Sequence, residues 1–216
     1  MTVHAPVPDY AAARQAMVDS QLRPQGVSDP AVIAAMSLVP RELFVPEGER
    51  LLAYAERAIP LAEGRALPAP AVPGLLLTAM IPDRGGTALV VGAATGYSAA
   101  VLAEMGLKVT ALESSASLAE VARRRGVNVI EGRLDKGHRK GAPYDLILID
   151  GAVEYIPDEL IDQLAEGGRL GGAIVDQGIT RLVVGRKAGG GFGFHSIADA
   201  ATPVLPGFQR PRAFTF

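Results

Sequence analysis

Short apolar runs alternate with helix-forming stretches between Thr87 and Gly151, and this alternation constrains the fold more than any other feature of the sequence. The apolar runs read "TALVVG", "KVTALE", "VNVIEG" and "YDLILIDG", and the first three are separated by "YSAAVLAEMG" and "SLAEVARRRG". Apolar strands separated by helices are typical of βαβ units, in which helices cover both faces of a parallel sheet. We therefore predict an α/β fold with a Rossmann-like core.

Helices are predicted on the N-terminal side of this core. "YAAARQAMVDSQLR" has helix-forming composition, and "SDPAVIAAMSLV" offers Ser28 or Asp29 as the N-cap and Pro30 as the first helical residue. A connection rich in proline follows, after which "GLLLTAMI" predicts one more short helix.

The C-terminal part predicts a helix followed by strands. The helix is "DELIDQLAEGG", and the strand candidates are "RLGGAIV", "TRLVVGRK", "GFGFHSI" and "RAFTF". Their close spacing and Gly-rich turns predict that the sheet finishes with antiparallel strands. We expect a single domain made of a helical extension with a loop (residues 1–82), the Rossmann-like core (83–185) and C-terminal strands (186–216).

The composition argues against several classes of function. A formal net charge of −2 gives the chain no general attraction to nucleic acid or to anionic membranes. There is no cysteine and the three histidines are scattered, so we expect no metal centre. The sequence has no apolar run of membrane-spanning length, and "MTVHAPVPDY" does not resemble a signal peptide. We expect a cytoplasmic protein, either a monomer or a homodimer.

The first apolar run leads into a turn of small residues and then into a helix. Gly92, Ala94 and Gly96 are spaced so that backbone N–H groups at the helix N-terminus can approach a ligand closely. The dinucleotide pattern G-x-G-x-x-G fails, because its second and third glycine positions hold Ala94 and Tyr97. The turn is instead similar to the G-x-G-x-G turn of class I methyltransferases. This similarity implies that S-adenosyl-L-methionine is the cofactor and that Gly92, Ala94, Gly96 and Tyr97 hold it.

Two acidic residues end later apolar runs. Glu113 lies 21 positions after Gly92, where this fold places an acid against ribose hydroxyls. The alternative is a glycine-rich turn with a solvated glutamate. Asp150 is predicted to point from the end of its run toward the cofactor or acceptor pocket, where it would hold an acceptor amine or hydroxyl or the methionine end of the cofactor. The alternative is that Asp150 only caps the following turn.

A longer pattern carries a family resemblance. It comprises "MVDSQLRPQGVSDPAVIAAMSLVPRELFVP" (residues 17–46), "AYAERAIPL" (53–61), "GYSAAVLAEMG", "APYDLILI" and "GGRL". Over roughly residues 15–185 the chain resembles the protein-L-isoaspartate (D-aspartate) O-methyltransferases. The resemblance implies protein repair by methyl transfer from S-adenosylmethionine to the α-carboxylate of L-isoaspartyl residues in a protein or peptide. It also implies that Leu134 lies beside the adenine.

The chain departs from the family pattern in the loop that serves the acceptor. Where the family has a Gly-Gln-Thr-Ile-Ser-type stretch, this chain reads "GRALP" (residues 64–68), so Ala66 and Pro68 replace two hydroxyl residues. Losing one hydrogen bond to a charged group costs about 10- to 150-fold in rate when it acts in the transition state. Arg65 could hold a carboxylate in compensation, or it could lie in solvent.

Two further departures concern the adenine and the acceptor. Arg133 stands where the family has an acid near the adenine, and Asp150 replaces a small uncharged residue and would repel a carboxylate acceptor. We therefore predict a divergent member whose acceptor site is lined by Asp150 and Arg65. Three functions stay open: isoaspartyl methylation, methylation of another acceptor with help from Asp150, and a non-catalytic role on a retained fold.

Overall fold

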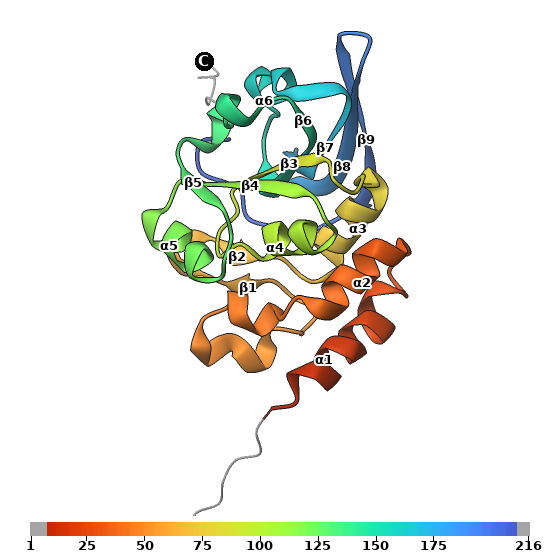
Figure 1. Cartoon of the computed structure of the whole chain (residues 1–216), viewed down its shortest axis with the longest axis vertical. Coiled ribbons are helices and arrows are strands. Elements are labelled where there is room, and N and C mark those ends of the chain that lie inside the picture. The colour runs from red at the N-terminus through yellow and green to blue at the C-terminus, as the bar shows by residue number, and fades with distance from the viewer. Residues whose placement is uncertain (1–7, 211–216) are drawn as a thin grey trace, which may run out of the picture.

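The central sheet follows the predicted alternation. The computed structural model of the chain describes residues 8–210 (Figure 1). Seven strands lie in the order β5-β4-β3-β6-β7-β8-β9. They are β3 (Thr87–Val91), β4 (Lys108–Glu113), β5 (Val129–Glu131), β6 (Tyr144–Val153), β7 (Leu164–Asp176), β8 (Ile179–Ala188) and β9 (Gly191–Asp199).

Strand direction changes within the sheet as predicted. β3 pairs in parallel with β4 and β6, and parallel pairing continues to β5 on one side and to β7 on the other. β7, β8 and β9 are joined by antiparallel pairing. The predicted antiparallel finish is therefore confirmed, although the fourth strand candidate, "RAFTF", lies outside the described residues.

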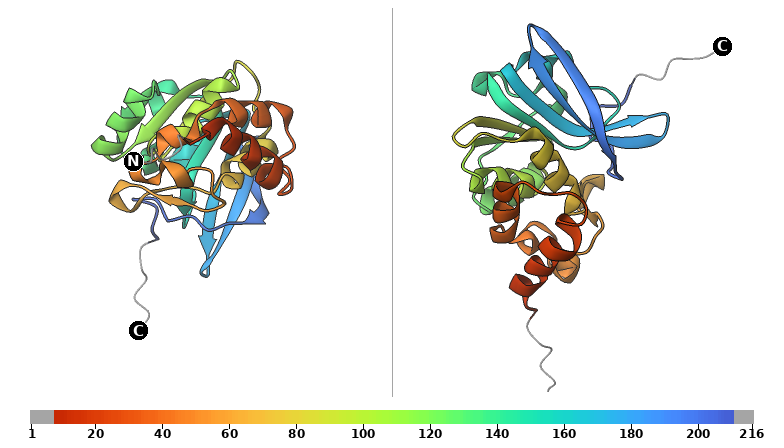
Figure 2. Two further views of the ribbon diagram at one scale, coloured as in Figure 1. Left: turned by 90° about the horizontal axis from the view of Figure 1, so that it is seen from below. Right: turned by 90° about the vertical axis from the view of Figure 1, so that its right-hand side faces the viewer.

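The helical extension packs against one face of the sheet. Its helices are α1 (Tyr10–Met17), α2 (Pro30–Leu38) and α3 (Ala71–Met80), with a small hairpin of β1 (Ile59–Pro60) and β2 (Ala66–Leu67) before α3. Asp29 caps α2 by accepting the N–H groups of Ala31 and Val32 at 2.8 and 3.0 Å. In Figures 1 and 2, α1 and α2 lie toward one end of the molecule and the β8–β9 hairpin at the other, with α3 between them.

The two faces of the sheet are covered differently. Ala88 and Val90 of β3 join a core with the extension, α4 (Tyr97–Glu104) and α5 (Ala116–Arg124). Leu89 and Val91 point the other way into a core with α6 (Asp158–Asp162) and the C-terminal segment. The expectation of helices on both faces holds only in part, because the β5–β6 connection is broken by glycines and a proline, which are poor helix formers.

Two predicted element boundaries are wrong. The helix expected over "DELIDQLAEGG" is limited to α6, because Leu164 already pairs with Tyr144 as the first residue of β7. β6 does not end at Asp150. It continues through Ala152 and Val153, which pair with β7. In both places pairing within the sheet overrides local sequence preference.

After β9 the chain returns across the sheet. In Figure 1 the dark-blue segment crosses from the β9 side to the β5 side. The N–H of Ala152 donates to the carbonyl of Pro203 at 3.0 Å, the N–H of Leu205 donates to the carbonyl of Ala152 at 2.8 Å, and the N–H of Glu154 donates to the carbonyl of Phe208 at 3.1 Å. Residues 203–208 are therefore held by backbone bonds to β6 and the residue that follows it.

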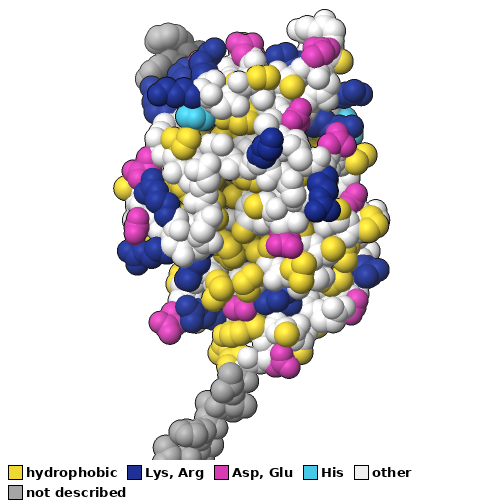
Figure 3. Space-filling model, viewed as in Figure 1, with side chains coloured by type: hydrophobic (Ala, Val, Ile, Leu, Met, Phe, Trp, Pro, Cys, Tyr) yellow, Lys and Arg dark blue, Asp and Glu magenta, His cyan; other side chains and the backbone are white. Residues whose placement is uncertain are grey.

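Charges of both signs are interspersed over the face shown in Figure 3, with hydrophobic side chains between them. This mixture agrees with the small net charge of the chain. Within residues 8–210, none of the helices has the length and apolar character needed to cross a membrane.

Candidate functional site

The predicted small residues form a tight turn between β3 and α4. Gly92 and Gly96 have φ values of 76° and 95°, a region that favours glycine, and Ala94 adopts φ 49° between them. The N–H groups of Gly92 and Ala93 both donate to the carbonyl of Leu112, at 2.9 and 3.1 Å, which ties the turn to β4. The turn thus lies at the carboxyl edge of the parallel strands, where ligands bind in open α/β sheets.

Glu113, at the end of β4, lies directly against this turn. Its side chain is 0% exposed. It accepts hydrogen bonds from the backbone N–H groups of Ala94, Ser114 and Ser115 at 2.7, 2.8 and 3.0 Å. The structure therefore brings Glu113 and the turn together, as the spacing predicts.

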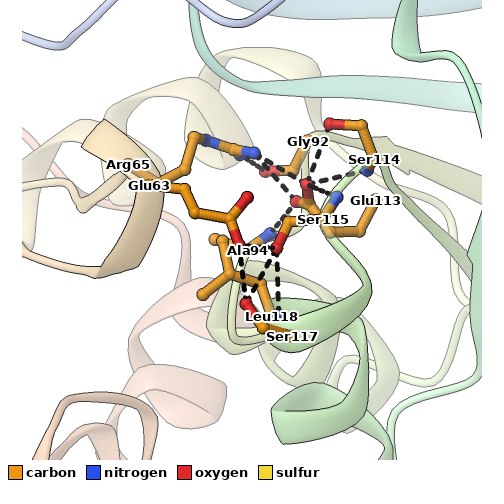
Figure 4. Close-up of polar contacts among 9 residues, drawn as sticks. All are labelled: Glu63, Arg65, Gly92, Ala94, Glu113, Ser114, Ser115, Ser117 and Leu118. Atoms are coloured by element: carbon orange, nitrogen blue, oxygen red, sulfur yellow. Dashed lines mark hydrogen bonds and ion pairs between the residues drawn. The ribbon is translucent and has the colours of Figure 1, made fainter.

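Arg65 occupies the remaining side of the Glu113 carboxylate (Figure 4). Its Nη1 lies 2.8 and 3.0 Å from the two carboxylate oxygens, and its Nη2 donates to the carbonyl of Gly92 at 2.5 Å. Only 6% of Arg65 is exposed. Arg65 does not lie in solvent, and the carboxylate that it holds is Glu113 of the chain itself rather than that of an acceptor.

The loop that carries Arg65 has a second contact beside the first. Glu63 adopts φ 56°, and its carboxylate accepts from the hydroxyls of Ser115 and Ser117, both at 2.8 Å, at the start of α5. These two hydrogen bonds, that from Ser117 first, lower the pKa of Glu63. Figure 4 shows Glu63 and Arg65 reaching the β4–α5 junction side by side.

Leu205 covers the turn from the C-terminal segment. A β-carbon added to Gly92 would lie 2.8 Å from Leu205 Cδ1, and one added to Gly151 would lie 2.5 Å from Leu205 Cδ2. The absence of side chains at these two glycines therefore makes room for Leu205. The same Gly92 position is 3.0 Å from Nη2 of Arg65, so the two segments meet there.

The predicted adenine side is also occupied. Leu134 is buried in one apolar cluster with Leu205 and Phe208. Arg133, by contrast, extends into solvent and pairs with Asp135, with Nη2 and Oδ2 2.7 Å apart. Arg133 therefore does not enter the adenine side. What fills that side is the apolar C-terminal segment.

In this arrangement Arg65 and Leu205 take positions that S-adenosylmethionine would need. A ribose would need a free acceptor on Glu113, yet this carboxylate already has five hydrogen bonds of 2.7–3.0 Å, and a carboxylate has about four lone-pair sites. The position over Gly92 is taken by Leu205 and Arg65. The residues predicted to bind the cofactor lie together, but Arg65 and Leu205 contact them in its place.

Asp150 lies within β6, partly buried. Burial raises its pKa to about 6, while the Ser98 hydroxyl and the positive charges of Arg65 and Arg41 act in the opposite direction. The hydroxyl that acts on its pKa belongs to Ser98 of α4 and not to the turn that follows Asp150, so the pocket-facing alternative stays the prediction for this residue.

Tyr97 begins α4, but its side chain packs against the helical extension. Its ring meets the ring of Phe44 edge-on at 5.6 Å, and the guanidinium of Arg41 lies 4.8 Å from the ring centre. Arg41 is fully buried and donates from Nε to the carbonyl of Ala53 at 2.6 Å and from Nη2 to that of Pro68. Arg41 thus fixes the C-terminal end of the loop that carries Arg65.

Sequence reasoning missed several residues that shape this site. Glu63, Arg41, Leu205 and Phe208 carry no pattern that points to it, and the only available signal was the string "GRALP" itself, where a cation replaces family residues. In the part of the chain from 8 to 210, the structure brings together no group of three His, Cys, Asp or Glu side chains suited to a metal ion.

The chain is similar to known proteins over most of its length. The family model described as protein-L-isoaspartate(D-aspartate) O-methyltransferase matches residues 12–193. A protein-L-isoaspartate O-methyltransferase from Methylorubrum extorquens is 42% identical over 172 residues, 76% of this chain and 75% of the relative. One from Gloeobacter violaceus is 42% identical over 161 residues, 71% of this chain and 78% of the relative.

Solved structures agree on the fold. A protein-L-isoaspartate O-methyltransferase from Plasmodium falciparum, in complex with S-adenosyl-L-homocysteine, superposes with a TM-score of 0.78 at 21% identity, over 89% of this chain and 97% of that one. A second protein-L-isoaspartate O-methyltransferase gives 0.78 at 24% identity, over 90% and 66%. The predicted class I methyltransferase fold is therefore confirmed. The chain belongs to the protein-L-isoaspartate(D-aspartate) O-methyltransferase family.

Proposed function

We propose that this chain is an S-adenosylmethionine-dependent methyltransferase whose acceptor is the α-carboxylate of an L-isoaspartyl residue in a protein or peptide. The observation that carries the proposal is the family match over residues 12–193, which includes the helical extension, the loop of Arg65 and the turn at Gly92. The relatives at 42% identity are named for this activity.

The charges around Asp150 are compatible with a carboxylate acceptor. A carboxylate is ionised at neutral pH and needs no general base, so the chain has to bind and orient it and exclude water. The positive charges of Arg65 and Arg41 lower the pKa of Asp150, and the negative charge of Glu113 raises it. Two positive and two negative side chains balance, so Asp150 does not give this region a net negative charge.

Buried hydroxyls beside the turn could replace those missing at Ala66 and Pro68. Tyr97 Oη and Ser98 Oγ are buried and make no hydrogen bond of normal geometry within residues 8–210, although the Ser98 hydroxyl lies near enough to Asp150 to lower its pKa. An unsatisfied buried hydroxyl costs about 1–3 kcal/mol, which a bound acceptor group would recover. These two side chains are therefore our candidates for orienting the acceptor.

Asp150 itself favours a second candidate function, methylation of an amine or hydroxyl. A carboxyl group whose pKa is raised to about 6 is ionised at pH 7 and is a better base than an ordinary aspartate. This function requires proton removal, whereas isoaspartyl methylation does not. Asp150→Asn therefore separates the two: it should abolish transfer to an amine or hydroxyl and leave transfer to a carboxylate measurable.

The test is transfer of radiolabelled methyl groups from S-adenosylmethionine to an isoaspartyl peptide, with the same peptide carrying ordinary aspartate as the control. Methyl esters release methanol in mild base, whereas methylated amines and hydroxyls do not. Base-labile label on the isoaspartyl peptide alone supports the first function. Base-stable label that is lost with Asp150→Asn supports the second. No label on any acceptor contradicts both.

A further inference from the structure

Two segments far apart in sequence close the site at Gly92 and Glu113: the loop of residues 61–67 and the C-terminal segment of residues 203–208. We propose that these closing segments form an autoinhibitory plug, in which Arg65 takes the place of the cofactor's ribose on Glu113 and Leu205 covers the turn. S-adenosyl compounds then bind only after the plug is displaced. This inference rests on the proposed function, because it identifies the place of the plug with the cofactor site.

The hydrogen bonds of Arg65 are those that a ribose would compete for. Its guanidinium contacts both oxygens of Glu113 and the carbonyl of Gly92, all at 3.0 Å or less. Arg65 brings a positive charge to the buried Glu113 carboxylate, whereas a ribose offers the same carboxylate only neutral hydroxyl donors. A ribose therefore cannot displace Arg65 without a loss at Glu113 that other contacts must offset.

The loop is held as a unit. The N–H of Leu61 donates to the carbonyl of Arg65 at 2.8 Å, and Glu63 is fixed to Ser115 and Ser117. Glu63 is exposed and keeps a left-handed backbone that side chains rarely adopt, so its two serine contacts are what hold that conformation. The exposed Glu63 thus helps to hold the buried Arg65 in place through its contacts with the two serines.

The plug also predicts how affinity responds to substitution. When only a fraction of the protein is competent to bind, the apparent dissociation constant rises by the inverse of that fraction. Removing a contact that exists only in the closed state raises the competent fraction. Arg65→Ala should therefore tighten binding of S-adenosylhomocysteine by about 10- to 150-fold, and Glu63→Ala by about two- to tenfold.

The experiment is calorimetric titration of S-adenosylhomocysteine into the full chain, comparing the wild type with Arg65→Ala and Glu63→Ala. Arg23→Ala is the matched control, because its guanidinium is mostly exposed and its one ion pair with a residue in the range 8–210 is with Asp19 at 3.6 Å. Glu63→Ala keeps the test decisive when Arg65→Ala does not fold, because Glu63 is exposed and lies outside the core. Circular dichroism establishes that each variant is folded.

Tighter binding by both loop variants, with Arg23→Ala equal to the wild type, is the expected result. Folded variants that bind S-adenosylhomocysteine no more tightly than the wild type overturn the plug, whether the wild type binds or not. Methyl transfer is measured separately, so the two proposals fail differently. Tighter binding without transfer to any acceptor keeps the plug and rejects the proposed function, whereas transfer with unchanged binding does the reverse.

Discussion

Replacing Arg65 by alanine is expected to destabilise the folded chain by about 3 kcal/mol. Arg65 and Glu113 are both buried, and Arg65 supplies two of the five short hydrogen bonds on the Glu113 carboxylate as well as one to the carbonyl of Gly92. Removing one partner of a buried ion pair leaves the other charge uncompensated, at a cost of about 3–5 kcal/mol. Three backbone N–H groups still hold Glu113, which places the expected cost at the lower end.

The assay is urea unfolding of the wild type, Arg65→Ala, Glu113→Gln and the double variant. Because Glu113→Gln removes the charge that Arg65→Ala leaves unpaired, the double variant should cost about 2 kcal/mol less than the sum of the single variants. For a chain of this size a loss of about 3 kcal/mol lowers Tm by about 6–12 °C. Arg23→Ala, at an exposed ion pair, should change stability by less than about 0.5 kcal/mol.

Two outcomes would refute this reasoning. A cost below about 1 kcal/mol for Arg65→Ala would mean that Glu113 is satisfied without its cation. Single costs that add within about 0.5 kcal/mol would mean that the two side chains are not coupled, although they lie 2.8 Å apart. Either result would also remove the competition at Glu113 on which the plug depends.

Three further predictions concern other parts of the fold. Since the pKa of Asp150 is raised in the folded state from 3.8 to about 6, stability should fall as the pH rises from about 4 to 6. Asp150→Asn should then be about 2–3 kcal/mol more stable than the wild type at pH 7 and no more stable at pH 4 in urea unfolding. Leu205→Ala should cost about 2–5 kcal/mol in the same assay, and a cost under 1 kcal/mol would contradict tight packing on Gly92. Asp29→Ala should cost about 0.5–2 kcal/mol through loss of the α2 cap, and unchanged thermal unfolding would contradict the capping role.

The parallel half of the sheet is predictable because its strands are buried on both faces and are therefore apolar throughout. The α2 cap is predictable because Asp29 and Pro30 are favoured at the N-cap and at the first position of a helix. Prediction fails where partners distant in sequence decide the outcome. Leu164 follows residues of good helix propensity, but it is fixed by pairing with Tyr144, and the extension of β6 past Asp150 depends on β7 in the same way.

The site shows the same two cases: contacts set by the order of the strands are predictable, and contacts made by distant segments are not. Gly92 and Glu113 can be brought together from sequence, because the ends of neighbouring parallel strands meet at one edge of the sheet. The partner of Arg65 cannot be chosen from sequence, since a guanidinium suits an acceptor's carboxylate as well as an internal one. Leu205 gives no signal at all, because a leucine in the loosely matching C-terminal part has no chemistry of its own.

Under the proposed function and the proposed plug, one loop links acceptor recognition to cofactor access. The stretch "GRALP" that lacks the acceptor hydroxyls at Ala66 and Pro68 is also the stretch that places Arg65 on Glu113. Arg41 donates to the carbonyl of Pro68 and fixes one end of this stretch, while Glu63 fixes the other. Moving Arg65 away from Glu113 must then disturb Ala66 and Pro68, the positions proposed to line the acceptor site. A partner that binds the loop from the acceptor side would open the cofactor site by the same movement, and binding of acceptor and cofactor would be coupled with the same factor in both directions.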